Sequence, residues 1–345
     1  MHLSDALISP AVGGTLWAVT AGVTAWSAGA LARCPSERRV ALMGVLGAFV
    51  FAAQMVNFTI PGTGSSGHLG GGMLLAILLG PHAAFLVMAS VLTVQALLFA
   101  DGGLLALGCN VVNLSFFTSF LVYPLVFRPI AGLYPSRPRL YVAAILAAIL
   151  GLQIGALGVV LETTASGISE LPFGAFALLM QPIHLAIGVV EGLVTASAVG
   201  LVWQARPEIL SDRAKSNPRS LRPVLVGLAL VAILTGGVLS WFASQNPDGL
   251  EWSAAHASGQ EALAARPDGF HGWFARIQTA TSLMPDYDFQ KTENAAEAPK
   301  GWPAIKAGTS LSGLLGSAIV LALVLGTGLL LRLSRRPRVA PEDAP

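Results

Sequence analysis

Two histidines, His2 and His68, are the side chains of this sequence best suited to hold one metal ion together. The terminal amine of Met1, the main-chain nitrogen of His2 and the Nδ1 atom of His2 can close two fused chelate rings, which makes a planar clamp. His68, in the glycine-rich stretch 62–71, can supply a fourth nitrogen. A square of nitrogens suits Ni(II) or Cu(II) rather than tetrahedral zinc. The clamp requires a free amino terminus, and we expect one because the start of the sequence has neither a basic n-region nor a small-residue cleavage site.

Other interpretations of these residues stay open from the sequence. His68 can equally be a solvated histidine in an ordinary tight loop. Glu191 and His184 lie two helical turns apart in an apolar segment, and a carboxylate inside a membrane is a candidate for ion coupling. The alternative is that these two side chains contact each other or fix helix packing through hydrogen bonds.

The amino-acid composition indicates whether such a site belongs to a soluble protein or to a membrane protein. Hydrophobic residues make up 54% of the 345 residues and charged residues 11%, and the mean hydropathy is +0.69. The sequence therefore predicts an all-α polytopic membrane protein. We expect nine apolar spans, at 11–31, 40–58, 69–80, 83–99, 103–127, 140–162, 179–203, 223–243 and 309–331.

The distribution of Lys and Arg predicts how these spans are oriented. Short loops rich in these residues stay in the cytoplasm. With the amino terminus outside and the carboxyl terminus in the cytoplasm, most of the 20 basic residues fall on the inner side. The exceptions all lie in one long segment: Arg266, Arg276, Lys291, Lys300 and Lys306. We therefore expect a multi-pass protein of the inner (plasma) membrane.

The same rule favours a turn at Gly80-Pro81. If 69–99 were a single span, the basic stretches 128–139 and 204–222 would face outward. A proline is tolerated in such a turn because surrounding protein satisfies the broken helix. We expect the short span before the turn to lie inside the bundle.

The predicted domain organisation has three parts. Residues 1–205 form seven closely spaced spans, and 206–222 form a basic cytoplasmic linker. Residues 223–345 form a two-span hairpin that encloses an outer segment at 244–308. That segment is too small and polar to bury a large core, so we expect it either to pack on the membrane part or to stay mobile.

Several classes of function are disfavoured. Gly62 and Gly67 have the spacing of a phosphate-binding loop, but His68 stands where that loop needs Lys. The sequence has no His-Glu-x-x-His motif, so we expect no enzyme activity and no catalytic cofactor. The net charge of +2 gives no reason to expect nucleic acid as a partner. Cys34 and Cys109 fall in different predicted environments, so no disulfide follows.

Five stretches occur in the order typical of the CbiM/NikM family, which the sequence resembles over about residues 1–205. They are MHLSDAL at 1–7, PGTGSSGHLGG at 61–71, ILLGP at 77–81, VQALLFADGGLLALG at 94–108 and HLAIGVVEGLVT at 184–195. Residues 247–252, PDGLEW, resemble the start of the PDGLE/NikN-type partner. Members of the family are substrate-binding subunits of energy-coupling-factor importers for cobalt and nickel. The resemblance implies a seven-helix substrate-binding bundle with an additional two-helix hairpin.

The resemblance also implies a ligand set and partners. The metal ligands would be the amine of Met1, the amide nitrogen and Nδ1 of His2, and His68. The chain would capture Ni(II) or Co(II) on the outer side and depend on separate ATPase subunits and a transmembrane coupling subunit. Because all these ligands lie in residues 1–68, we expect the segment 244–308 to matter more for transport than for binding. Two alternatives remain: a self-sufficient secondary transporter or channel that uses His184 and Glu191, and an intramembrane metalloenzyme.

Overall fold

The computed structural model describes residues 2–33, 36–133, 135–209, 220–260, 263, 269–289 and 302–333. Met1 and Cys34, which the sequence singles out, lie outside these described residues. Nearly all of the regular structure is helical, as predicted. The longer helices are α1 (Pro10–Arg33), α2 (Glu37–Gln54), α3 (Gly72–Leu79), α4 (Pro81–Leu98), α7 (Arg137–Ser166), α8 (Phe173–Ala205), α9 (Arg222–Gly237), α10 (Gly249–Ser258), α11 (Gly269–Thr281) and α12 (Ala307–Leu333).

A further helical stretch and several short turns complete the architecture. Residues 107–131 are continuous helix with a π-helical centre, made of α5 (Leu107–Val111), η2 (Val112–Phe127) and α6 (Arg128–Ala131). The short 3₁₀ turns are η1 (Asp5–Leu7), η3 (Pro207–Ile209), η4 (Leu239–Phe242) and η5 (Pro285–Tyr287).

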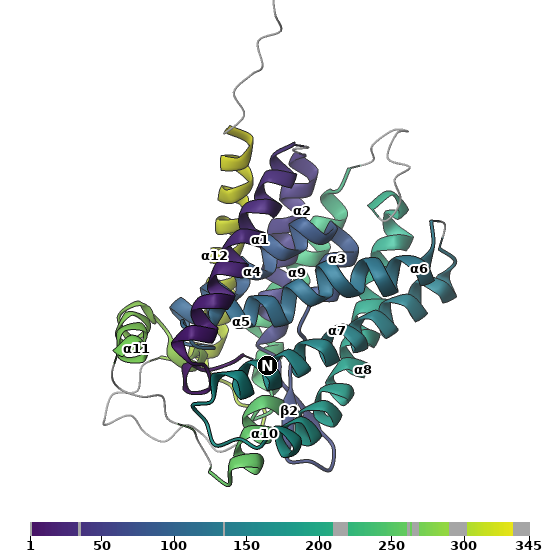
Figure 1. Cartoon of the computed structure of the whole chain (residues 1–345). Helices are drawn as coiled ribbons and strands as arrows, with labels where there is room; N and C mark the ends of the chain where they lie inside the picture. Colours follow the sequence, from purple (N-terminus) through teal and green to yellow (C-terminus); the bar gives the residue numbers. More distant parts are fainter. Residues whose placement is uncertain are drawn as a thin grey trace, which may run out of the picture.

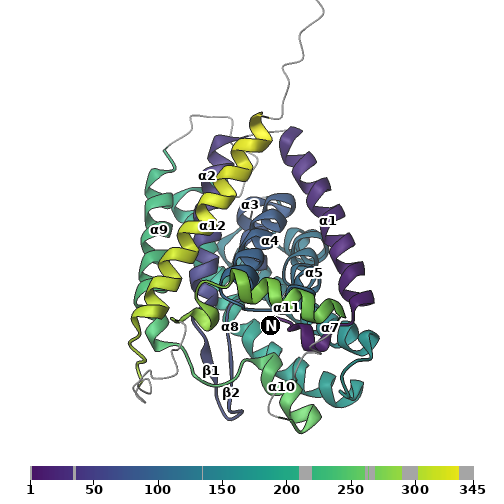
Figure 2. The same ribbon diagram turned by 90° about the vertical axis from the view of Figure 1, so that its left-hand side faces the viewer.

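Each of the nine predicted apolar spans contains a helix. Among the described residues, five helical stretches are long and apolar enough to cross a membrane: α4, 107–131, α7, α8 and α12. Helix α3 is different, because its 8 residues extend only about 12 Å, against a hydrocarbon core of about 30 Å. All of its residues are buried, so it lies inside the bundle, as expected (Figures 1 and 2).

The turn predicted at Gly80-Pro81 separates α3 from α4. Gly80 adopts a φ of +79°, a value that residues with a Cβ rarely adopt. Pro81 is at the start of α4, where a missing N–H costs no helical hydrogen bond. At the other end of α3, a Cβ on Gly72 would collide with the carbonyl of Leu114 and the hydroxyl of Thr118. Glycine at this position therefore lets α3 pack directly on η2.

The prediction of an all-α fold misses one element. Strands β1 (Phe58–Ile60) and β2 (Ser65–Gly67) form an antiparallel hairpin in which Phe58 pairs with Gly67. Its tip contains Gly62 and Gly64, both with positive φ. Strands this short leave no apolar periodicity to detect in the sequence.

The described parts of the C-terminal region pack on the rest of the protein. Helices α9 and α12 come together where Gly236 and Gly313 bring their backbones into contact, and Ser317 of α12 donates a hydrogen bond to a carbonyl of α2. Figure 2 shows α9 and α12 along one side of the bundle, with α10, α11 and the β-hairpin gathered at one end. Of the two alternatives for the outer segment, packing is the one observed for its described residues.

Candidate metal centre

The start of the chain is fixed inside the protein by main-chain hydrogen bonds. Asn110 pairs with Leu3 in both directions: the Leu3 N–H donates to Oδ1 at 2.7 Å, and Nδ2 donates to the Leu3 carbonyl at 3.2 Å. The N–H of Gly103 donates to the same carbonyl at 2.8 Å. Asp5 accepts a hydrogen bond from the N–H of Ala106. These contacts hold the residue next to Leu3, which is His2, in a defined position.

The imidazole of His2 contacts a carboxylate that the sequence analysis did not single out. Its Nδ1 lies 2.8 Å from Oδ1 of Asp101, and the hydroxyl of Tyr287 donates to Oδ2 of Asp101 at 2.5 Å. Nε2 of His2 is buried without a partner. Burial by itself raises the pKa of Asp101, but the charge of His2 and the hydrogen bonds from His2 and Tyr287 hold that pKa well below its usual range.

Backbone strain is concentrated at this contact. Within the described residues, the non-glycine positions with positive φ are Ala100, Asp286 and Tyr287. Each costs on the order of 1–3 kcal/mol and persists only when surrounding contacts enforce it. Ala100 adjoins Asp101, and Tyr287 contacts it, so the strained residues are the ones that bring Tyr287 and Asp101 together.

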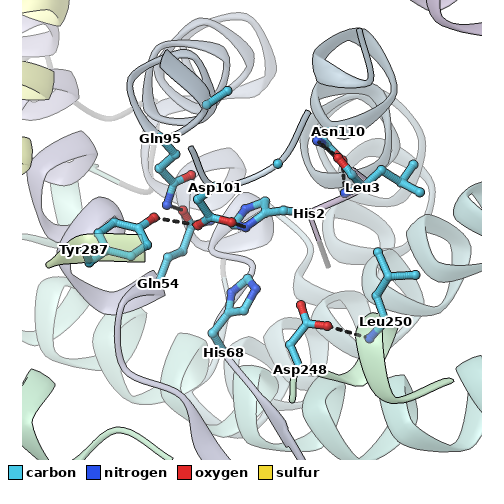
Figure 3. A network of polar contacts seen from close by, with 12 residues as sticks. His2, Leu3, Gln54, His68, Gln95, Asp101, Asn110, Asp248, Leu250 and Tyr287 are labelled. Carbon is cyan, nitrogen blue, oxygen red and sulfur yellow. Dashed lines mark hydrogen bonds and ion pairs between the residues drawn. The ribbon is translucent and has the colours of Figure 1, made fainter. Parts of the chain in front are cut away.

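His68 is beside His2, as the metal clamp requires, but it is buried rather than solvated. The two imidazole rings are stacked, with centroids 4.9 Å apart and planes inclined by 21° (Figure 3), and His68 is 8% exposed. The alternative of a solvated histidine in an ordinary loop is therefore wrong, because the C-terminal segment covers the loop. Burial, and then neighbouring positive charge, lower the pKa of His68 to about 3. The neutral ring keeps a lone pair that can bind a metal ion.

Hydrogen bonds determine which nitrogen of His68 carries that lone pair. Nδ1 lies 3.1 Å from the carbonyl oxygen of Leu69. A carbonyl only accepts, so Nδ1 is the protonated donor and Nε2 the lone-pair nitrogen.

The loop that follows His68 is anchored by Glu191 in the membrane part. The N–H of Gly70 donates to Oε2 at 2.9 Å and the N–H of Gly71 donates to Oε1 at 3.0 Å. Gln54 donates to the carbonyl of Gly70 at 2.8 Å. Gly71 has a φ of +78°, which only glycine adopts without strain. Glu191 thus fixes the backbone two and three residues after His68.

Of the alternatives open for Glu191 and His184, a direct contact between the two side chains is not observed. His184 instead donates from Nδ1 to the carbonyl of Met180, at 2.8 Å, on its own helix. Its Nε2 is buried without a partner. The His184 residue lines a small cavity together with His68 and Asp248. The cavity has room for about one water molecule.

The C-terminal segment docks on the loop of His68 and on the loop of Asp101. The N–H of Ser66, two residues before His68, donates to the carbonyl of Pro247 at 2.8 Å. Gln278 donates to the carbonyls of Ala96 and Gly102, on either side of Asp101. The main-chain N–H groups of residues 283, 284 and 286 in the same segment donate to the carbonyls of residues 98 and 99. The segment therefore covers the site and contributes residues to it.

Sequence analysis did not single out three of the residues at the candidate site. Asp101, Asp248 and Tyr287 surround the two histidines (Figure 3). Asp101 and Asp248 lie in stretches that carried the family resemblance, 94–108 and 247–252, and this signal was not used. Tyr287 had no such signal. No group of three or more His, Cys, Asp or Glu side chains arranged to hold a metal is found in the part of the chain that the structure describes.

Comparison with known proteins identifies the family. Residues 2–209 match the family model CbiM, described as the cobalt uptake substrate-specific transmembrane region, and residues 222–333 match the PDGLE domain. The putative fused nickel transport protein NikMN of Archaeoglobus fulgidus is 31% identical, over 94% of this chain and 96% of the relative. The fused nickel transport protein NikMN of Rhodobacter capsulatus is also 31% identical, over 93% of this chain and 95% of the relative.

Two further comparisons cover a smaller share of the chain. The cobalt transport protein CbiM of Sorangium cellulosum is 32% identical, over 49% of this chain and 75% of the relative. A crystal structure of a truncated transition metal transporter aligns with a TM-score of 0.53 and 27% identity, over 59% of this chain and 99% of that one. The chain belongs to the CbiM family of membrane transport proteins and carries a PDGLE domain fused after its CbiM region.

Proposed function

We propose that this chain is the substrate-capturing membrane subunit of an ATP-driven energy-coupling-factor importer for Ni(II) or Co(II). The metal is substrate, held by the terminal amine of Met1, the amide nitrogen and Nδ1 of His2, and His68. The observation that carries the proposal is the 4.9 Å separation of the two imidazole rings, which belong to loops far apart in the sequence. Neutral imidazoles are good ligands for both ions.

Metal binding in this way requires a rearrangement at His2. Its Nδ1 is the nitrogen engaged by Asp101, whereas Nε2 is the nitrogen without a partner. Rotation of the ring about the Cβ–Cγ bond releases Nδ1 for the chelate. Metal then replaces the protons of the ligands, as metal binding to amines and imidazoles generally does.

Nickel is the preferred substrate of the two. The support comes from two relatives that align with more than 90% of this chain, both of which are named fused nickel transport proteins. A relative named for cobalt aligns with only 49% of this chain. The proposed preference for nickel over cobalt is thus based on the fusion of the two domains and not on the four nitrogen ligands.

The division into 1–205, 206–222 and 223–345 remains part of the proposal. It agrees with the two family matches, which leave 210–221 between them. ATP hydrolysis is assigned to separate ATPase subunits, joined through a transmembrane coupling subunit. The amino terminus is assigned to the outer face of the inner membrane and the carboxyl terminus to the cytoplasm.

The rival assignment, a secondary transporter with a site inside the membrane, depends on His184 and Glu191 acting together. Each is engaged elsewhere, Glu191 by two loop N–H groups and His184 by the carbonyl of Met180. These contacts favour structural roles for both residues.

The test is uptake of ⁶³Ni by cells that produce the chain with and without the ATPase and coupling subunits. We expect uptake above background only when all subunits are present. Equal uptake without the ATPase subunits would establish the secondary transporter instead. Titration calorimetry on the purified chain, with nickel and then cobalt, measures the preference separately.

A further inference from the structure

The PDGLE motif contains a strand-like docking element that is built onto the loop of His68. Ser66 forms a parallel bridge with Asp248. Its N–H donates to the carbonyl of Pro247 at 2.8 Å, and its hydroxyl donates to the carbonyl of Asn246 at 2.8 Å. Ser66 is fully buried, so these bonds replace water at both partners and determine the register of the motif against the loop.

The glycine of the motif allows an approach that no other residue permits. A Cβ on Gly249 would lie 2.6 Å from a side-chain carbon of Ile183, 3.2 Å from the ring of His184 and 3.3 Å from Ile187. The backbone therefore lies directly on α8. Leu250, the next residue, is 3% exposed and fills the interface.

The aspartate of the motif is held in one orientation. Asp248 is the N-cap of α10, and its Oδ1 accepts hydrogen bonds from the N–H groups of Leu250 and Glu251, each at 2.8 Å. Glu251 completes a capping box by accepting the N–H of Asp248 at 3.1 Å. A cap held on both sides leaves the carboxylate little freedom to turn away.

The carboxylate so fixed belongs to the wall of the site. Asp248 and His68 line the same cavity, and Figure 3 shows Asp248 beside the two histidines. An aspartate is ionised at neutral pH, so Asp248 places a negative charge in the wall of the cavity that His68 also lines.

We infer that Asp248 of the PDGLE domain is a positioning residue of the metal site, an anionic partner that stabilises the bound divalent cation without coordinating it. The inference rests on the proposed function, because it takes His2 and His68 as ligands. A chelate of one divalent ion with one deprotonated amide keeps a net positive charge, and a fixed carboxylate in a buried site lowers its energy. The PDGLE domain thus acts in metal binding as well as in transport.

The test is nickel affinity of the full-length chain, measured by titration calorimetry in detergent, for Asp248→Asn and Asp248→Ser. Both residues are good N-caps, so α10 and its docking are preserved while the charge is removed. We expect affinity about 10- to 100-fold weaker, the usual cost of losing a partner outside the coordination sphere. The absorption spectrum of the bound nickel should stay that of the wild type, since the four nitrogens are unchanged.

Glu251→Gln is the matched control. It also removes one negative charge from α10 and retains an oxygen that accepts the N–H of Asp248, but Glu251 is exposed. Solvent screens such a charge, so we expect affinity within about twofold of the wild type. Wild-type affinity in Asp248→Asn, or an equal loss in Glu251→Gln, would overturn the inference. A changed nickel spectrum in Asp248→Asn would overturn the outer-sphere role, because Asp248 would then be a ligand.

His68→Ala separates this result from the proposed function. If His68→Ala loses nickel while Asp248→Asn keeps it, the ligand set stands and the role of Asp248 is wrong. If His68→Ala binds nickel normally, the ligand set itself is wrong, and the inference about Asp248 is overturned with it.

Discussion

Replacement of Glu191 by glutamine tests whether this intramembrane carboxylate anchors the loop of His68. In the wild type each carboxylate oxygen accepts one N–H, from Gly70 and from Gly71. Glutamine has nearly the same shape but only one acceptor oxygen. Its NH₂ group would face the second N–H, so two donors would oppose each other. The isosteric variant is therefore expected to disturb the loop.

The size of the effect follows from the bond that is lost. A hydrogen bond to a charged group contributes about 1.5–3 kcal/mol. Each 1.4 kcal/mol changes an equilibrium constant tenfold. The equilibrium constant for forming the binding-competent loop therefore falls by about 10- to 150-fold. Apparent affinity falls in proportion to the fraction of protein in that form, so this range is the upper limit for the loss of nickel affinity.

The assay is nickel titration of the purified variant, together with thermal unfolding to show that the bundle is intact. Glu162→Gln is the matched control, because Glu162 is another acid within the helices and accepts from Asn113, at 2.7 Å, rather than from the loop. We expect weakened binding in Glu191→Gln and wild-type binding in Glu162→Gln. Full affinity in a folded Glu191→Gln protein would refute the anchoring role.

Three other predictions concern the ligands. Titration calorimetry should show that His68→Ala abolishes high-affinity binding and His184→Ala does not; the reverse result would move the site into the membrane part. One residue added before Met1, or acetylation of its amine, should abolish binding in a protein that stays folded, and full affinity in the extended protein would remove the amine from the site. Because burial lowers the pKa of His68 from 6.5 to about 3, the unfolded chain takes up its proton first as the pH falls. The stability that neutral His68 contributes is thus complete above about pH 6.5 and is lost between pH 6.5 and 3. The Tm of metal-free wild type should fall relative to His68→Gln across that window, and parallel curves would contradict the lowered pKa.

The sequence predicted the helices well because apolar runs and punctuating residues are local signals. Each of the nine apolar segments contains a helix, and the turn at Gly80-Pro81 is present. Orientation of the chain stays a prediction, because it depends on a membrane that the fold does not include. The β-hairpin at 58–67 was missed because strands of three residues leave no apolar periodicity to detect.

The site was predictable only in its histidines. His2 and His68 were identified by residue type and by the glycines around His68, and the structure brings their rings together. The burial of His68 could not be inferred, because the residues that cover it are about 180 positions later in the chain. Tyr287 was missed for the same reason, and the PDGLEW motif showed Asp248 but not its place beside His68, because a tertiary contact leaves no spacing pattern in the sequence.

The fusion itself has a physical consequence for this site. Because the CbiM region and the PDGLE domain are one chain, docking of the motif at 246–251 on Ser66 is an intramolecular event. A covalent connection replaces the concentration of a separate partner by an effective concentration, in the millimolar range for short linkers. The interface can then be small and still remain formed. If Asp248 acts at the proposed metal site, a fused chain would keep it beside His68 at all times, whereas a separate subunit would do so only as far as its own concentration allowed.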